Sequence, residues 1–404
     1  MSLEILRRRN LVLWAIFLGA LGTSLIAATN SVFPNLLMRT MGSTPDFFGI
    51  NPFEVGIMAT PLIVISLILL GIAISYFKGM MPIRVVNSFR FISNFEISSR
   101  LALLVIVLLI GGFITFTVTQ LLTEEPFPDY YNVSKPSLAK WTFASITKGF
   151  DIHVEYFLNT TSMKVFGNYK IIPYIASIAL LVLTYFFTKL ITKSRLAGIA
   201  SMVVLLQSSI FLTYHNSVAY DNYWILFYLF SLYVVYKFWP LSPISLIASI
   251  FTKPLTIVFL PFTLFFIYRA GISKRRKILT AGSYVIVIIM GIYGALAWRA
   301  ATSLSAINTN GFWSAFNAFT YQLRFDPVVQ IFLLPVTVML FLTARRGAYH
   351  AESILLLLMS TVLLQPLASA FTVASSEPYR FMPLIVFFAI SVGMLLSKNF
   401  KLKE

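Results

Sequence analysis

The sequence has no cysteine, three histidines and few charged residues. The absence of cysteine excludes disulfides, thiol catalysis and thiolate metal sites. Charged residues make up 11% of the chain, whereas a soluble domain carries about a quarter. No glycine-rich phosphate loop is present, so the sequence predicts no nucleotide site. These shortages argue against a soluble enzyme built on cofactor or thiol chemistry.

Long apolar stretches make up most of the chain. Hydrophobic residues account for 58% of it, and the mean hydropathy is +0.84. Because every backbone polar group in lipid must be bonded within its own segment, we expect an all-α polytopic membrane protein of about 12 transmembrane or re-entrant helices. The first apolar segment is long enough for a retained span, although a signal peptide is the alternative. The twelve segments are about 11–29, 56–77, 101–121, 171–192, 196–213, 222–238, 241–252, 254–268, 278–297, 328–343, 352–371 and 381–397.

The net charge of +17 is explained by membrane topology and predicts no nucleic-acid partner. With the N-terminus inside, ten of the 14 acidic residues fall in outer loops. Both termini are then cytoplasmic, in a multi-pass protein of the cell membrane. The inner loops and tails hold 21 of the 31 Lys and Arg residues, namely Arg7, Arg8, Arg9, Lys78, Arg84, Arg90, Arg100, Lys189, Lys193, Arg195, Lys237, Arg269, Lys274, Arg275, Arg276, Lys277, Arg345, Arg346, Lys398, Lys401 and Lys403.

Two of the outer loops contain predicted amphipathic helices. In the longest loop, 122–170, we expect one helix over Pro136–Lys148 and a second that Gly167 ends, both lying on the membrane surface. In loop 298–327, apolar side chains on one helical face predict another interfacial helix; they are Phe312, Phe316, Phe319 and Leu323.

The densest acidic cluster directly follows the third apolar segment. Glu124, Glu125 and Asp129 lie there beside Tyr130 and Tyr131. They form either a solvated loop end or a reaction centre in which a carboxylate acts as general base. The tyrosines then either stack on a sugar ring or anchor the loop at the headgroups.

A second polar group follows in the same loop. Asp151 is placed to cap the second loop helix, and His153 and Glu155 could face the same cavity. Asp221 precedes a later span, where it could be an N-cap with aromatic neighbours. A metal site is not indicated, because the chain has so few histidines and His350 falls on the inner side.

Two outer cations are predicted to bind a phosphate. Lys253 stands at the turn of a short apolar hairpin, and Arg380 follows Tyr379 at the start of the last span. A charge close to hydrocarbon is costly and usually functional. Arg380 could equally snorkel to the interface.

The order of these features resembles the clan C (GT-C) glycosyltransferases, which use polyprenyl-phosphate sugars. Asp129-Tyr130-Tyr131 stands where that family has its acidic motif, and Val165-Phe166-Gly167-Asn168 stands where its loop helices end. Ala219-Tyr220-Asp221-Asn222, Phe251-Thr252-Lys253-Pro254 and Tyr379-Arg380-Phe381-Met382-Pro383 resemble its later motifs. The resemblance covers about residues 100–397.

The resemblance implies a GT-C-like catalytic domain over 100–404, with an N-terminal two-span addition over 1–99. It implies inverting sugar transfer from a polyprenyl (dolichyl) phosphate to a glycan, lipid or protein acceptor outside the cytoplasm. Asp129 would be the base, with Glu125 as its rival; in a shifted alignment Asp46 or Glu54 takes that place. Lys253, Tyr379 and Arg380 would bind the lipid phosphate. The acceptor side would be lined by Tyr130, Asp151, His153, Glu155 and Asp221. The lipid-linked sugar is the donor; a divalent cation is possible but not indicated.

Two other classes remain open. A transporter or flippase for a lipid-linked or anionic solute would carry charges within its spans and inverted repeats. Here the segment centres are almost free of charge, which favours chemistry at the surface. A non-catalytic membrane subunit with a degenerate site is the third class.

Overall fold

Every regular element in the described part of the computed structural model is helical. The structure describes residues 3–36, 51, 53–127, 130–148, 152–218, 222–297, 309–348, 350–371 and 378–397. The chain divides into two compact units. The first comprises Met1–Ala102, Thr188–Ile210 and Ser305–Glu404, and the second comprises Leu103–Phe187 and Phe211–Leu304.

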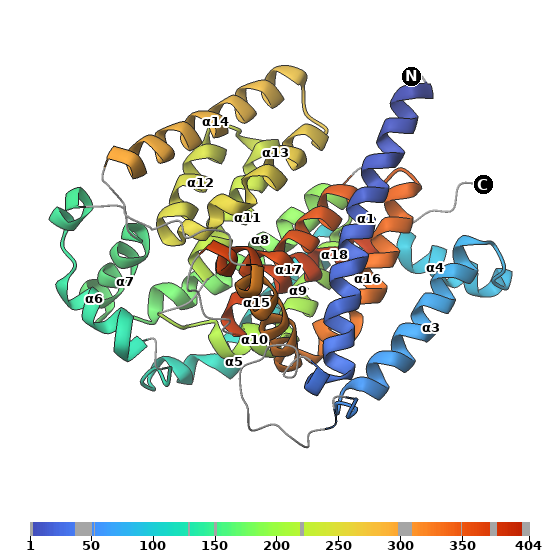
Figure 1. The fold of residues 1–404 in the computed structure, drawn as a ribbon, viewed down its shortest axis with the longest axis horizontal. Coiled ribbons are helices and arrows are strands. Elements are labelled where there is room, and N and C mark those ends of the chain that lie inside the picture. Colours follow the sequence, from blue (N-terminus) through green and yellow to red (C-terminus); the bar gives the residue numbers. More distant parts are fainter. Residues whose placement is uncertain are drawn as a thin grey trace. The chain divides into compact units, whose positions relative to one another are not determined.

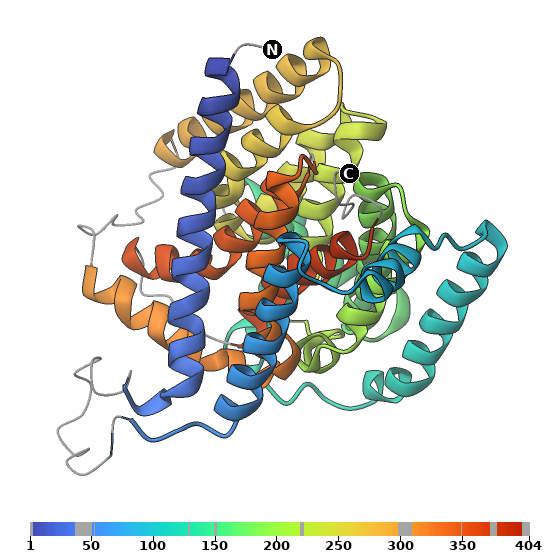
Figure 2. The same ribbon diagram turned by 90° about the vertical axis from the view of Figure 1, so that its right-hand side faces the viewer.

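In the first unit, a long N-terminal helix packs beside helices from the C-terminal third. Helix α1 lies alongside α16 and α17, and α18 packs on α9 (Figure 1, Figure 2). The elements of this unit are α1 (Leu3–Val32), α3 (Ala59–Phe77), α4 (Ile83–Asn94), α9 (Arg195–Leu206), α15 (Thr309–Gln322), η5 (Leu323–Phe325), α16 (Pro327–Arg345), α17 (Ala351–Phe371), η6 (Pro378–Phe381) and α18 (Met382–Leu395). The predicted boundary at residue 99 stays a prediction.

The core of the first unit is centred on α18, whose side chains are almost all buried. Gly393 of α18 faces Ala197 and Ser201 of α9, and a Cβ atom at residue 393 would collide with both. The missing side chain therefore lets the two helices approach closely. Such small-residue contacts are typical of helix packing in membranes.

One predicted span is divided by a break, and a buried acid lies at that break. The segment 196–213 was expected to be continuous, but α9 ends at Leu206 and α10 (Ser209–Tyr214) follows a break. At this break the Ser208 hydroxyl donates to the carboxylate of Asp326, which also caps α16 by accepting from the Val329 amide at 3.2 Å. The break places Ser208 at the N-terminus of α16, where an acidic cap is favoured.

The second unit joins the long outer loop to a group of shorter helices. It contains α5 (Ser99–Thr117), α8 (Ile171–Thr192) and α10 for most of their lengths. Its other elements are η1 (Val118–Leu121), η2 (Tyr130–Ser134), α6 (Lys135–Lys140), η3 (Phe143–Lys148), α7 (His153–Phe166), α11 (Asn222–Lys237), α12 (Leu241–Thr252), η4 (Pro254–Phe259), α13 (Leu260–Arg269) and α14 (Lys274–Ala297).

A ladder of serines joins α11 to α12. Ser242, Ser245 and Ser249 lie along one face of α12, and each donates its hydroxyl to a backbone carbonyl of α11. These bonds are 2.6–2.8 Å long and, because Ser249 pairs with Trp224 while Ser242 pairs with Ser231, the helices run antiparallel. Small hydroxyl side chains thus hold together two helices that have little charge.

Among the described residues, five helices are long and apolar enough to cross a membrane. They are Asn10–Val32, Ala59–Phe77, Ser99–Leu121, Ile171–Thr192 and Pro327–Arg345. The predicted all-helical fold is confirmed for the described residues, and these helices support a membrane protein. The count of about 12 spans and the GT-C-like arrangement stay predictions.

The predicted helices of loop 122–170 are correct in part. The one expected over Pro136–Lys148 is interrupted at Trp141, whose extended backbone separates α6 from η3. The second ends at Gly167, whose φ of 68° requires the left-handed region, as expected. Helix α7 buries polar residues such as Asn159 and exposes apolar ones such as Val165, at 65%. This outward apolar face agrees with a helix lying on a membrane.

The helix expected in loop 298–327 is present as α15, but its apolar face is not free. Phe316, Phe319 and Leu323 are buried, and the ring of Phe319 stacks on Phe381 with centroids 3.8 Å apart. The interfacial interpretation of this face was therefore wrong. A stripe of aromatic residues indicates burial but does not tell protein from lipid.

Candidate functional site

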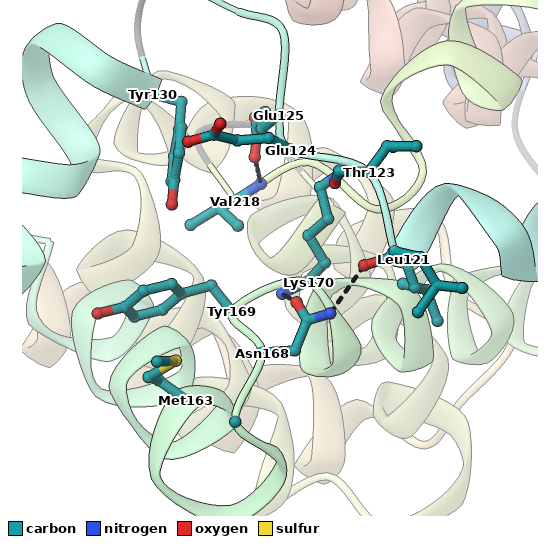
Figure 3. Close-up of a pocket in the computed structure, with 12 residues that line it drawn as sticks. Leu121, Thr123, Glu124, Glu125, Tyr130, Met163, Asn168, Tyr169, Lys170 and Val218 are labelled. Carbon is teal, nitrogen blue, oxygen red and sulfur yellow. Dashed lines mark hydrogen bonds between the residues drawn. The ribbon is translucent and has the colours of Figure 1, made fainter.

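The second unit contains a cavity of about 370 Å³ just beyond the end of η1. Figure 3 shows the Tyr130 and Tyr169 rings with Met163 on one side, and Leu121 and Thr123 on the other. The full lining is Leu121, Leu122, Thr123, Glu124, Glu125, Tyr130, Met163, Gly167, Asn168, Tyr169, Lys170 and Val218. The predicted acidic cluster and the end of the second loop helix therefore meet at one cavity.

Glu125 is the buried carboxylate of this site, with 2% of its surface exposed. It accepts hydrogen bonds from the hydroxyl of Ser217 and, at 2.9 Å, from the backbone N–H of Val218. Both donors come from the segment before α11, far along the chain. Glu125 thus fixes the acidic loop to that segment, because charge-assisted hydrogen bonds to a buried carboxylate are among the stronger ones.

Lys170 is the buried cation, with 7% of its surface exposed. Its Nζ donates to the carbonyl oxygens of Gln120 at 3.0 Å and Thr123 at 2.8 Å. The Asn168 amide donates to the Leu121 carbonyl at 2.8 Å (Figure 3). These bonds satisfy carbonyls left open where η1 ends. Burial lowers the pKa of Lys170, and the nearby Glu125 carboxylate partly offsets this shift.

Tyr130 closes one wall of the cavity. Its ring packs with Leu138, Tyr156 and Val218. Burial raises the pKa of Tyr130, and the Glu125 carboxylate raises it further. The phenol therefore keeps its proton at neutral pH and can donate a hydrogen bond to a ligand.

Glu124 is the exposed carboxylate at the edge of the cavity. It pairs with Lys135 at 3.4 Å, and this lysine also lies 5.5 Å from the centroid of the Tyr131 ring. Because both partners are largely exposed, the pair contributes little to stability. One carboxylate is therefore buried with two hydrogen-bond donors, while its neighbour is exposed at the edge of the cavity.

Of the other residues predicted for the acceptor side, those that the structure describes are not found among the residues that line the cavity. His153 and Glu155 are buried on the inner face of α7, and Trp141 Nε1 lies 3.5 Å from His153 Nδ1. Neither residue is among those lining the cavity. Asp129, Asp151 and Asp221 lie outside the described residues.

The predicted phosphate-binding cations belong to different units. Lys253 ends α12 in extended backbone, at the turn between α12 and η4, where a hairpin turn was expected. Arg380 lies in the first unit, and its Nε is 3.4 Å from the Tyr379 hydroxyl. The joint action of Lys253 and Arg380 stays a prediction.

Sequence reasoning missed Lys170, Tyr169 and Ser217. Lys170 did carry a signal, because it is a lysine at the outer end of a predicted span, where the positive-inside pattern disfavours one. Ser217 carried none, since nothing local pairs it with Glu125. Among the residues that the structure describes, no three His, Asp or Glu side chains converge as metal ligands.

Comparison with protein-family models found no match, and searches of curated proteins and of solved structures found none either.

Proposed function

We propose that this chain is an integral-membrane glycosyltransferase that moves a sugar from a polyprenyl phosphate to an acceptor outside the cytoplasm. The supporting observation is the cavity in which Glu124, Glu125, Tyr130 and Tyr169 converge beyond the candidate span Ser99–Leu121. Carboxylates orient sugar hydroxyls, and tyrosine rings present a flat apolar face together with a hydroxyl.

The proposed reaction is an inverting substitution at the anomeric carbon. The acceptor oxygen forms a bond to that carbon, and the bond from the carbon to the phosphate oxygen breaks. The polyprenyl phosphate leaves with the electron pair, and a carboxylate takes the acceptor proton. Asp129 is the favoured base, because both oxygens of the rival Glu125 already accept hydrogen bonds. Lys253, which belongs to the same unit as the cavity, neutralises the departing phosphate, an interaction that strengthens as the charge develops.

The test is release of polyprenyl phosphate by the purified chain from polyprenyl-phosphate mannose and glucose. Because general-base catalysis contributes about 10²–10⁴-fold, Asp129→Asn should lower kcat by at least about 100-fold. Glu125→Gln should lower the rate and also the thermal midpoint, since it removes the fixed carboxylate. The exposed Lys140→Gln is the control for handling and folding.

Two results would overturn the proposal. One is the absence of turnover with every lipid-linked sugar by a folded parent protein. The other is a folded Asp129→Asn variant and a folded Glu125→Gln variant that both work at the parental rate. Glu54→Gln, tested in parallel, distinguishes the shifted alignment from the preferred one.

A further inference from the structure

Helix α4 connects two candidate membrane spans and exposes an apolar face. It follows α3, which ends at Phe77, and precedes α5, which begins at Ser99 (Figure 1). Val85, Phe89 and Ile92 recur at helical spacing on this face and are 38%, 37% and 47% exposed. Asn87 lies on the opposite side of the helix and is also exposed. The polar residues Arg84, Asn87, Arg90 and Asn94 share that opposite side, and the exposed Ile83 and Phe91, at 66% and 69%, lie beside them. Helices with a basic polar side and an apolar side lie in the plane of a membrane interface.

The connection around α4 is strongly basic. Between the two spans, the three cations Lys78, Arg84 and Arg90 stand against a single acid, Glu96, and a fourth cation, Arg100, lies in the first turn of α5. That acid is already engaged, because the guanidinium and the backbone N–H of Arg195 donate to it at 3.3 and 3.0 Å. The charges around α4 therefore favour a negatively charged partner.

Local contacts hold α4 close to the end of a candidate span. The Phe89 ring lies 5.8 Å from Tyr76 in the last turn of α3. Arg346 caps the same end, with its guanidinium 3.9 Å from the Phe77 ring centroid and a hydrogen bond to the Phe77 carbonyl at 3.2 Å. Because α3 is long and apolar enough to cross the membrane, its end marks the depth at which headgroups begin.

We propose that α4 is an interfacial anchor that binds the anionic headgroup layer of the membrane. Val85, Phe89 and Ile92 enter the acyl boundary, and Arg84 and Arg90 contact lipid phosphates. The apolar face accounts for insertion, and the arginines account for the preference for anionic lipid. This proposal does not depend on the proposed transferase activity.

The absence of native cysteine allows each position to be labelled alone. The full chain carrying Ile92→Cys or Asn87→Cys is labelled with an environment-sensitive fluorophore. It is then reconstituted in phosphatidylcholine vesicles with and without phosphatidylglycerol. Spin-labelled lipid should quench the residue 92 label at least about threefold more than the residue 87 label, with iodide showing the reverse order.

The arginines are tested in the same labelled protein. One cation near an anionic surface strengthens binding by about fivefold, so Arg84→Gln with Arg90→Gln should abolish the extra lipid quenching that phosphatidylglycerol produces. The exposed Lys164→Gln is the matched control and should leave that increase unchanged. Equal iodide quenching at both positions would place the face in water and overturn the proposal. Shielding of residue 92 from both quenchers would mean that protein covers the face, and insensitivity to phosphatidylglycerol would remove the role of headgroup charge.

Discussion

Lys170 and Glu125 show how one unit accommodates ionisable groups away from water. Lys170 donates to two backbone carbonyls, and Glu125 accepts from a hydroxyl and an amide N–H. Each therefore has partners that favour its charged form, which offsets part of the cost of burial. Their first effect is to hold the acidic loop in shape, and any role in chemistry depends on that shape.

Replacing Lys170 by methionine should destabilise the second unit. The substitution keeps the apolar stem but leaves the Gln120 and Thr123 carbonyls without this donor, which costs about 1–3 kcal/mol. The thermal midpoint of the detergent-purified protein should fall. Lys164→Met removes an exposed lysine and is the control. An equal effect of both substitutions would show that the two hydrogen bonds contribute nothing.

His215 should make stability depend on pH below neutrality. Its ring is buried against Phe113 and Tyr174, and burial lowers its pKa from 6.5 to about 4. The unfolded chain therefore binds a proton near pH 6.5 and the folded chain only near pH 4. The free energy of unfolding falls as the pH decreases through this window, by up to roughly 3 kcal/mol.

The pH effect is measured by comparing thermal midpoints at pH 7 and pH 5. The parent should lose more stability between these values than His215→Gln. His350 also has a pKa lowered to about 4 by burial, so His350→Gln is assayed beside it and the two contributions are separated. Identical losses in the parent and His215→Gln would contradict the assignment.

At the scale of helices, local sequence signals predicted where a helix ends better than they predicted which residues surround it. Gly167 ended α7 as expected because a left-handed residue favours glycine, and Lys253-Pro254 interrupted the short hairpin as expected. The break before Ser208 was not predictable, since the acid that accepts a hydrogen bond from Ser208 lies 118 residues away. The same limit applies to the cavity, whose Glu125 was singled out while its partner Ser217 was not.

The contact between α9 and α18 gives a prediction about helices. Gly393→Ala should force the two helices apart, because the added methyl meets Ser201 and Ala197, and overpacking of this kind costs about 1–3 kcal/mol. Gly71→Ala in α3 is the matched control, since a Cβ there meets nothing within 4 Å. The thermal midpoint should fall for the first variant and hold or rise for the second. A fall in both would point to a general intolerance of helix substitutions.

For the whole molecule, the distribution of charge predicts which loops face the cytoplasm. Ser273→Cys lies beside the basic run Lys274–Lys277 and should be protected from a membrane-impermeant maleimide in intact cells. Lys135→Cys, in the loop with the acidic cluster, should be labelled. The reverse pattern would place the cavity on the cytoplasmic side and remove the proposed outer location of the reaction.

The hydrogen bond between Glu125 and Ser217 also determines when the acidic loop can be fixed during synthesis of the chain. It joins residues 92 positions apart, and a ribosome adds about 5–20 residues per second, so the acidic loop waits roughly 5–20 s for its partner. The five helices α6 to α10 are made during that interval. The cavity consequently cannot be completed until about half of the chain has been made, and a nascent chain that stops before residue 217 carries the acidic loop without the contact that fixes it.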